Sequence, residues 1–236
     1  MSDRRRVLLK LSGEALAGEK KTGFDEETVR RVAAQVRRAA DEGVELGIVI
    51  GGGNFWRGRS SKAIDRTKAD AIGMLATVMN CLYVSEIFRD CGMQTEIYTP
   101  FVCGSMTKLY SKDEADADLK AGKILFFAGG LGHPYFSTDT ICVLRALELE
   151  CREILLAKSI DGVYDSDPAT NPQARKYDVI SIDEIVEKGL KVIDGTAAAM
   201  CRDYPVPMQI FDLGEEDSIY RAMQGLSNGT RITAGN

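Results

Sequence analysis

The 236-residue sequence has few of the residues that build metal centres, disulfide frameworks or nucleic-acid surfaces. It has one histidine, His133, so a metal site made of several histidines is excluded. Its six cysteines stand at irregular spacings without a C-x-x-C motif, which indicates reduced residues and not zinc ligands or disulfides. Acidic residues outnumber basic ones, 35 to 30, whereas a nucleic-acid-binding surface is normally basic.

Long apolar stretches are also missing, because no apolar run approaches the roughly 18 residues that a membrane span needs. The N-terminus, MSDRRRVLLKLSG, places charges before a short apolar run, as signal peptides do. However, Lys10 interrupts that run, and Gly13 and Glu14 stand where a cleavage site would have small residues. We therefore expect a first strand here, and a cytoplasmic protein that binds neither membranes nor nucleic acid.

The sequence does contain short apolar runs that alternate with helical patterns. β-branched apolar runs predict strands at 7–11, 46–50, 95–99, 124–128, 153–157 and 208–212. Helical spacing of apolar residues predicts helices at 25–42, 68–90, 113–121, 138–150, 181–190 and 215–224. This alternation predicts an α/β fold, with helices on both faces of a mostly parallel sheet.

The segment 160–180, which contains DSDPATNP, has the strongest loop composition in the chain. It is more typical of a binding loop than of a linker between domains. We therefore expect residues 1–236 to form a single domain, with ligands at the carboxyl ends of the strands.

Two glycine-rich turns follow predicted strands. The first, GEALAGEKKT (13–22), has Glu19 at the lysine position of a P-loop, and the second, GGGNFW (51–56), lacks the last glycine of the dinucleotide-binding pattern. Even so, glycines let backbone amides approach an anion, and Arg57 adds a planar charged fork that suits phosphate oxygens. The alternative is a tight turn beside an incidental surface arginine, but three consecutive glycines after a buried strand favour phosphate binding.

Lys10 is unusual because it lies inside an apolar strand that ends at Ser12 and Gly13. Its ammonium is expected to emerge at the carboxyl end of that strand. The alternative is a lysine whose stem lies along an edge strand with its charge in water. The neighbouring glycine turn favours a cation that points into the same crevice as the triple glycine.

The segments LLKLSGEAL, VIGGGNFWRG, GMLATVMN, HPYFSTD, DGVYDSDP and KVID occur in this order. Over essentially its whole length the chain resembles the bacterial uridylate (UMP) kinases of the amino-acid kinase superfamily. The segments GMLATVMN and FSTD separate these enzymes from carbamate, acetylglutamate and aspartate kinases. The resemblance implies an open αβα sandwich around a mostly parallel sheet, the amino-acid kinase or carbamate kinase-like fold.

The resemblance also implies a reaction and its partners. The γ-phosphoryl group of ATP is transferred to UMP to give UDP in pyrimidine nucleotide biosynthesis. Mg²⁺ is expected to be held mainly by the nucleotide phosphates. The implied assembly is a homohexamer, with UTP as a candidate feedback inhibitor.

The motifs carry a set of site residues onto this chain. The implied catalytic residues are Lys10, Arg57 and Asp139. The implied ATP-binding residues are Lys10, Leu11, Ser12, Gly13, Gly53, Arg57, Lys158, Ser159, Tyr164 and Asp167. The implied UMP-binding residues are Gly52, Asp70, Leu131, Gly132, His133, Pro134, Tyr135, Phe136, Ser137 and Thr138.

The resemblance gives some of these residues specific roles. Lys10 bridges the transferred group, and Asp139 orients that lysine. Tyr164 and Asp167 lie against the adenine and ribose of ATP.

Three acidic residues and His133 have alternative readings. Asp70 accepts from the UMP ribose hydroxyls in the resemblance, but Asp70, Asp139 and Asp194 are also typical of helix starts. His133 stands where related sequences often carry asparagine, and it is either a polar loop residue or a functional one.

Two other functions remain open. One is an amino-acid kinase that acts on a carboxylate or carbamate, which would need a clamp for the substrate carboxylate instead of Asp70. The other is a nucleotide sensor without turnover, which would have no need for Lys10, Arg57 and Asp139 together.

Overall fold

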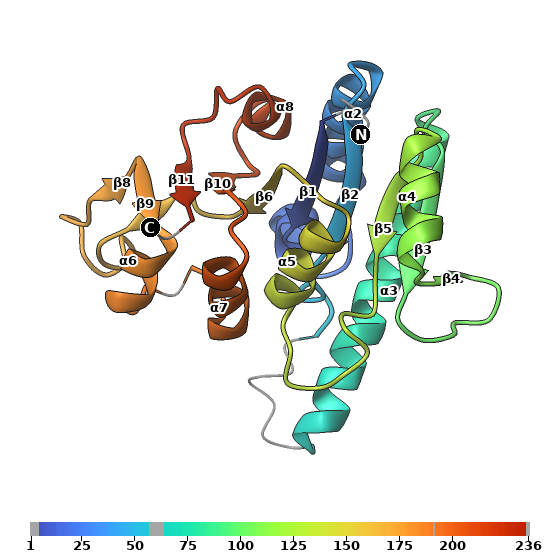
Figure 1. Cartoon of the computed structure of the whole chain (residues 1–236), viewed down its shortest axis with the longest axis horizontal. Coiled ribbons are helices and arrows are strands. Elements are labelled where there is room, and N and C mark those ends of the chain that lie inside the picture. Colours follow the sequence, from blue (N-terminus) through green and yellow to red (C-terminus); the bar gives the residue numbers. More distant parts are fainter. Residues whose placement is uncertain (1–4, 57–63, 191, 235–236) are drawn as a thin grey trace.

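The computed structural model describes residues 5–56, 64–190 and 192–234 (Figure 1). Its main feature is a nine-stranded sheet with the order β4-β3-β5-β2-β1-β6-β10-β11-β9. Neighbouring strands are parallel except β10 and β11, which are antiparallel. The strands are β1 (Arg6–Leu11), β2 (Glu45–Ile50), β3 (Thr95–Thr99), β4 (Lys108–Leu109), β5 (Ile124–Phe127), β6 (Glu153–Lys158), β9 (Val179–Ser181), β10 (Met208–Asp212) and β11 (Thr230–Thr233). A separate antiparallel pair consists of β7 (Val163–Tyr164) and β8 (Lys176–Tyr177).

Helices cover both faces of the sheet, as the sequence predicts. The helices that pack on one face are α2 (Glu26–Asp41), α3 (Arg66–Asp90) and α8 (Ser218–Met223). Those on the other face are α4 (Lys112–Lys120), α5 (Thr138–Glu148), α6 (Ile182–Glu187) and α7 (Gly195–Asp203). Two short turns of helix, α1 (Gly13–Leu16) and the 3₁₀ helix η1 (Gly18–Lys20), follow β1. The predicted αβα sandwich is confirmed.

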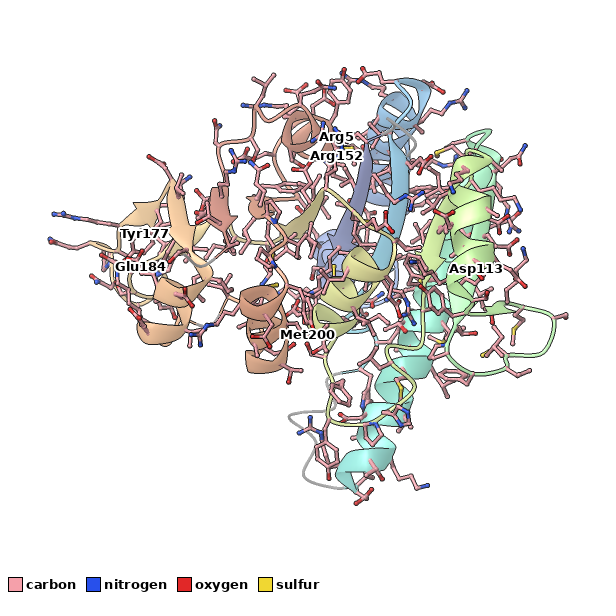
Figure 2. All side chains as sticks on the ribbon, in the orientation of Figure 1. Arg5, Asp113, Arg152, Tyr177, Glu184 and Met200 are labelled. Carbon is pink, nitrogen blue, oxygen red and sulfur yellow. The ribbon has the colours of Figure 1, made fainter. Side chains whose placement is uncertain are left out.

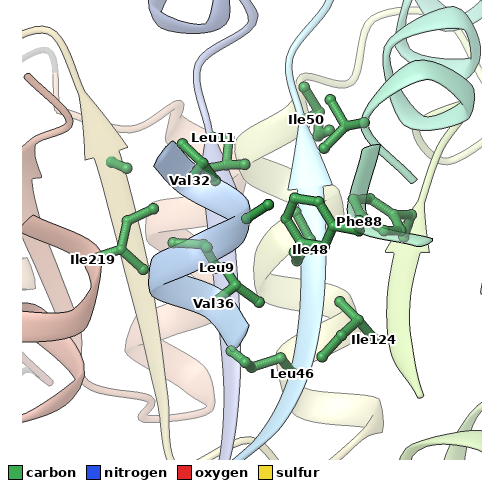
Figure 3. Close-up of a cluster of buried hydrophobic side chains, with 14 of the residues drawn as sticks. Leu9, Leu11, Val32, Val36, Leu46, Ile48, Ile50, Phe88, Ile124 and Ile219 are labelled. Atoms are coloured by element: carbon green, nitrogen blue, oxygen red, sulfur yellow. The ribbon is translucent and has the colours of Figure 1, made fainter. Parts of the chain in front are cut away.

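The central strands are buried on both faces because their side chains alternate between two apolar cores. Leu9 and Leu11 of β1 point toward α2, where Val32 and Val36 pack against them (Figure 3). Leu8 points the other way, into the core beneath α5. This alternation places Lys10 on the α5 side of the sheet, two residues beyond Leu8.

The longest helix, α3, is apolar around most of its circumference. Its length and composition alone would allow it to cross a membrane, although no such span was expected from the sequence. Nearly half of its most apolar window is buried, and Val84 and Phe88 lie in the core beside β5. Its packing against the sheet is that of a core helix.

All six strands and all six helices predicted from the sequence are present. The structure differs from the prediction in additional elements and in the start of one helix. The segment 160–180 was expected to be a loop, but it contains β7 and β8, and β9 begins at its end. Helix α3 begins at Arg66 and not at residue 68, because Asp65 caps it by accepting from the backbone nitrogens of Thr67 and Lys68. Helix α7, strands β4 and β11, and the short helices α1 and η1 were not predicted.

Candidate active site

Two lysines lie on the same side of the sheet at the carboxyl ends of adjacent strands. Lys10 pairs in register with Leu156 of β6, and Lys158 is the last residue of that strand, two positions further along. Because side chains on a strand alternate, Leu156 and Lys158 share one face. Both ammonium groups therefore approach the start of α5, which covers this edge.

Asp139 lies in the first turn of α5 and forms an ion pair with Lys10. The two side chains are only 13% and 17% exposed, so the pair is largely shielded from solvent. Ser137, and not Asp139, caps the helix, because its hydroxyl accepts from the backbone nitrogen of Asp139 at 3.0 Å. The Asp139 carboxylate therefore remains available for the cation.

Lys158 is the second cation of this cluster. Burial lowers the pKa of its ammonium; the Asp139 carboxylate opposes that shift, and the Lys10 ammonium adds to it. The Lys158 ammonium donates to the backbone carbonyl of Val192. The Asp139 carboxylate thus interacts with two ammonium groups, those of Lys10 on β1 and Lys158 on β6.

Close packing explains the glycines that end β1 and β2. A Cβ atom on Gly13 would lie 2.2 Å from the carbonyl oxygen of Gly51, and one on Gly52 would lie 2.9 Å from the carbonyl oxygen of Gly73 in α3. A Cβ on Gly53 would lie 2.6 Å from a carboxylate oxygen of Glu14. These contacts bring the two turns and α3 together at one edge of the sheet. Arg57, which was predicted to follow them, lies outside the described residues.

A buried pair of side-chain amides that was not predicted from the sequence holds the triple-glycine turn. Asn54 and Asn80 donate to each other's side-chain oxygens at 3.0 and 2.8 Å, and both are almost fully buried. Asn80 also donates to the carbonyl of Gly51 at 2.7 Å, and Asn54 donates to that of Gly23 at 2.8 Å. The only signal in the sequence was that Asn54 lies within the segment VIGGGNFWRG and Asn80 ends the segment GMLATVMN.

Asp70 joins α3 to the loop that precedes α5. Its carboxylate accepts from the Arg66 guanidinium at 2.9 Å and from the backbone nitrogen of Tyr135 at 2.8 Å. Tyr135 adopts a φ of 72°, a conformation that non-glycine residues rarely take. Because α3 starts at Arg66, Asp70 lies in the second turn and is not a helix cap.

Three cavities lie along this edge of the sheet and share their walls. The hairpin cavity, about 450 Å³, is lined by Lys158, Ile160, Gly162–Tyr164, Ser166–Pro168, Gly189, Leu190, Val192 and Ile210. The central cavity, about 810 Å³, has Asp139, Lys158 and Asp194 in its wall. The α3 cavity, about 190 Å³, is lined by Gly52, Trp56, Ala69, Asp70, Gly73, Met74, Thr77, Gly130, His133 and Phe136–Thr138.

Neighbouring cavities share wall residues, and the three together are called the trough. Lys158 and Val192 line both the hairpin and the central cavity. Asp70 and Thr138 line both the central and the α3 cavity. Asp139 and Lys158 line the central cavity, which adjoins both of the others, and Lys10 joins this cluster through its ion pair with Asp139 although it lines none of the three cavities. The hairpin cavity and the α3 cavity could each hold part of a ligand.

Several predicted site residues do not present side chains to these three cavities. Leu11 is fully buried in one apolar core, so only its backbone could meet a ligand. Leu131 is partly buried against the other core and lines none of the three cavities. Ser159 and Tyr135 are exposed and line none of the three. Tyr164 and Asp167 do line the hairpin cavity, and His133 lines the α3 cavity.

Comparisons with known proteins show the family and the fold of this chain. The model of the amino acid kinase family matches residues 5–212. The structure of UMP kinase from Bacillus anthracis is 34% identical, with a TM-score of 0.93 over 98% of this chain and 97% of that chain. UMP kinase from Ureaplasma parvum is 30% identical, with a TM-score of 0.92 over 98% and 99%. Uridylate kinase from Archaeoglobus fulgidus is 25% identical, with a TM-score of 0.74 over 96% and 99%. On this evidence the chain belongs to the amino acid kinase family.

Proposed function

We propose that this protein transfers the γ-phosphoryl group of ATP to UMP, giving ADP and UDP. The observation that carries the proposal is that Asp139, the ion-pair partner of Lys10, and Lys158 line the central cavity, which shares wall residues with both the hairpin cavity and the α3 cavity. Phosphoryl transfer needs donor and acceptor phosphates in line, with cations at the point where they meet. The likeness to three solved uridylate kinases supports UMP as the acceptor.

The hairpin cavity is the proposed site of the donor nucleotide. Tyr164, Ile160 and Val163 give it an aromatic and apolar wall for adenine, and Asp167 supplies a carboxylate for the ribose. The ATP phosphates then extend toward Lys158. The proposed ATP contacts are Lys10, Leu11, Ser12, Gly13, Gly53, Arg57, Lys158, Ser159, Tyr164 and Asp167.

The α3 cavity is the proposed site of UMP. Asp70 accepts from the ribose hydroxyls, in the place where it now accepts from Arg66 and Tyr135. The proposed UMP contacts are Gly52, Asp70, Leu131, Gly132, His133, Pro134, Tyr135, Phe136, Ser137 and Thr138. The acceptor phosphate then points toward the cluster of lysines.

In the proposed reaction a phosphate oxygen of UMP forms the new bond to the γ-phosphorus while the bond to the bridging oxygen of ADP breaks. Lys10 and Lys158 stabilise the negative charge on the transferred group and on the leaving phosphate. Asp139 acts as a positioning carboxylate that holds Lys10 in line. Arg57 is the third proposed catalytic cation.

Mg²⁺ is part of the proposal as the companion of ATP. Within residues 5–56, 64–190 and 192–234, no three His, Cys, Asp or Glu side chains come together as a preformed metal site. Because Mg²⁺ is usually bound through substrate phosphates and a few carboxylates, phosphate oxygens are expected to supply most of its ligands. When bound, the ion would neutralise charge on the β- and γ-phosphates.

A homohexamer, inhibition by UTP and a cytoplasmic role in pyrimidine nucleotide synthesis complete the proposal. An apolar surface supports self-association: Ile72, Leu75 and Met79 of α3 are about half exposed, and their spacing places them on one face of the helix. The loop after β3 also exposes Val102 and Met106. Sedimentation of the purified protein tests the assembly.

The deciding experiment is a coupled assay of ADP release with UMP, CMP and dCMP compared side by side. The proposal expects ATP-dependent turnover that is highest with UMP. Turnover of a carboxylate or carbamate in its place would indicate another amino-acid kinase. Binding of both nucleotides without ADP release would indicate a sensor.

A further inference from the structure

One wall of the hairpin cavity is held by a carboxylate that does not line the cavity itself. Asp161 accepts from the Tyr164 hydroxyl at 2.8 Å with one carboxylate oxygen and from the Lys176 ammonium at 2.8 Å with the other. Tyr164 faces the cavity, whereas Asp161 lies behind it. A ring that is tethered through its hydroxyl has less rotational freedom than a free one.

The chain around Asp161 is anchored to distant segments. Lys176 also donates to the carbonyl of Asn228 at 2.9 Å, and the backbone nitrogen of Val163 donates to the Thr230 hydroxyl at 2.8 Å. A Cβ atom on Gly162 would lie 2.5 Å from that hydroxyl oxygen and 2.8 Å from Cδ of Lys176. The segment 161–164 is thus fixed between β8 and β11.

The electrostatics of this network keep Asp161 ionised at neutral pH. Burial alone would raise the pKa of its carboxyl group, but hydrogen bonds from Lys176 and Tyr164 and the charge of Lys176 outweigh burial and hold the pKa below its usual value. The hydrogen bond to Asp161 in turn raises the pKa of the Tyr164 hydroxyl. The phenol therefore remains a donor, and its bond to Asp161 is charge-assisted.

We propose that Asp161 is a positioning residue for the donor base, acting through Tyr164 and Lys176 without touching the nucleotide. This inference rests on the proposed function only in taking ATP as the occupant of the hairpin cavity. The tether holds the Tyr164 ring in the conformation that an adenine would stack on. Its loss therefore weakens ATP binding while the phosphate-binding lysines stay in place.

The chain contains a matched network that serves as a control. Tyr98 donates to Asp118 at 2.7 Å, and Lys108 and Lys123 approach the same carboxylate at 3.1 and 2.8 Å. In Figure 2, Tyr177, the neighbour of Lys176, lies at one end of the molecule, and Asp113, on the helix that carries Asp118, lies on the other side. None of these control residues lines the three cavities.

The test compares Tyr164→Phe and Asp161→Ala, singly and together, with Tyr98→Phe and Asp118→Ala. For each variant, kcat, the KM of each nucleotide and the thermal melt are measured, with ATP affinity determined separately by equilibrium dialysis. Loss of a hydrogen bond to a charged group corresponds to about a ten-fold change or more. We expect each hairpin variant to weaken ATP binding and to raise the ATP KM by that factor, and to change kcat and the UMP KM by less.

The double variant separates positioning from general destabilisation. If Asp161 acts through Tyr164, the two changes together weaken ATP binding by much less than the product of the single effects. The control variants change the melt and leave ATP binding as in the wild type. Unchanged ATP affinity in Tyr164→Phe overturns the inference even if Asp161→Ala fails to fold, and so does a fully multiplicative double variant.

The outcome is distinguishable from a failure of the proposed function. If the wild-type chain binds ATP but does not phosphorylate UMP, UMP is excluded as the acceptor. Equilibrium dialysis of ATP with the Asp161 variant still decides the role of Asp161. A wild-type chain that binds no ATP overturns both.

Discussion

Asp139 and Asp194 occupy similar places in the chain but use their oxygens differently. Each lies at the start of one of two helices, α5 and α7, that pack together on the same face of the sheet. Asp194 caps α7, accepting from the backbone nitrogens of Thr196 at 2.8 Å and Ala197 at 3.1 Å. It also accepts from the hydroxyls of Ser137 and Thr140. Asp139 does not cap α5, because Ser137 does so, and its carboxylate pairs with Lys10.

The difference shows that a position at a helix start does not decide what a carboxylate does. Asp194 accepts from four neutral donors, two on the backbone of α7 and two on α5, which suits a residue that joins two helices. Asp139 has a cation as its partner, at a place where phosphate charge would compete for that cation. We therefore expect substitution of Asp139 to lower activity with little effect on stability. Substitution of Asp194 should lower stability with little effect on activity.

Lys10→Ala should give the largest effect, because it removes the cation that Asp139 holds. Removing one donor that stabilises transition-state charge costs about 10²–10³-fold in kcat, and we expect a loss of that size. Circular dichroism should show an intact fold. Wild-type kcat in the folded variant would show that Lys10 does not act at the phosphate site. Its partner Asp139 would then have no catalytic role to set it apart from Asp194.

Asp139→Asn should lower kcat by about a hundred-fold, as misplaced positioning groups do. Its melting temperature should stay close to that of the wild type, because the Ser137 cap is untouched. Steady-state kinetics beside a thermal melt measure both properties. Full activity in this variant would make Asp139 equivalent to Asp194 and would contradict the proposed mechanism.

Asp70→Asn adds a third carboxylate to the comparison, one proposed to bind substrate directly. A hydrogen bond to a charged group contributes about 1.5–3 kcal/mol, which corresponds to a rise of about ten-fold or more in the UMP KM. The ATP KM should change little. A raised ATP KM with an unchanged UMP KM would place Asp70 at the wrong nucleotide.

Asp194→Asn should give the smallest effect on activity, with kcat within a few-fold of the wild type. Asparagine caps a helix about as well as aspartate, but its side-chain NH₂ group cannot accept from Ser137 and Thr140. We expect a loss of about 1 kcal/mol, which is about 2–4 °C in melting temperature for a chain of this size. A hundred-fold loss of kcat without a shift of the melt would reverse the assignment of the two carboxylates.

The pH dependence of the same variant sharpens this point. Burial raises the pKa of Asp194, but hydrogen bonds from Ser137, Ala197, Thr140 and Thr196 outweigh burial and lower it below its ordinary value. A carboxylate with a lowered pKa contributes stability that is present above the ordinary pKa, about 4, and is lost as the pH falls below it. Melting temperatures between pH 6 and 3 should therefore fall more steeply in the wild type than in Asp194→Asn. Parallel curves would contradict the role given to Asp194.

The sequence predicted the parts of the fold that repeat a strong local pattern. Long apolar strands such as β1 and β2 were found because each is buried on both faces. The two-residue strands β7 and β8, and the polar strand β11, were missed because pairing with other segments creates them and their composition does not. Helix α7 was missed because GTAAAMCRD has little apolar periodicity, and its most visible signal is the cap, Asp194.

The same distinction applies to the site. Lys10 and Asp139 were predicted from motifs, and the structure brings them together. Asn54 and Asn80 were missed because their partners lie 26 residues apart and only the fold joins them. Asp161 was missed because it acts from behind a cavity wall, which no local pattern reveals. The role of Arg57 stays a prediction.

The anchoring of the hairpin to the last strand has a consequence for how the protein is made. The ribosome completes the chain from its N-terminus, and every residue of the α3 cavity has been added by position 138. The segment 161–164 beside the hairpin cavity, by contrast, is held through Asn228 and Thr230, which are added about ninety residues later. A nascent chain therefore contains every residue of the proposed acceptor pocket before it contains the residues that secure the donor pocket. Tight ATP binding is then expected only after Thr230 has been added.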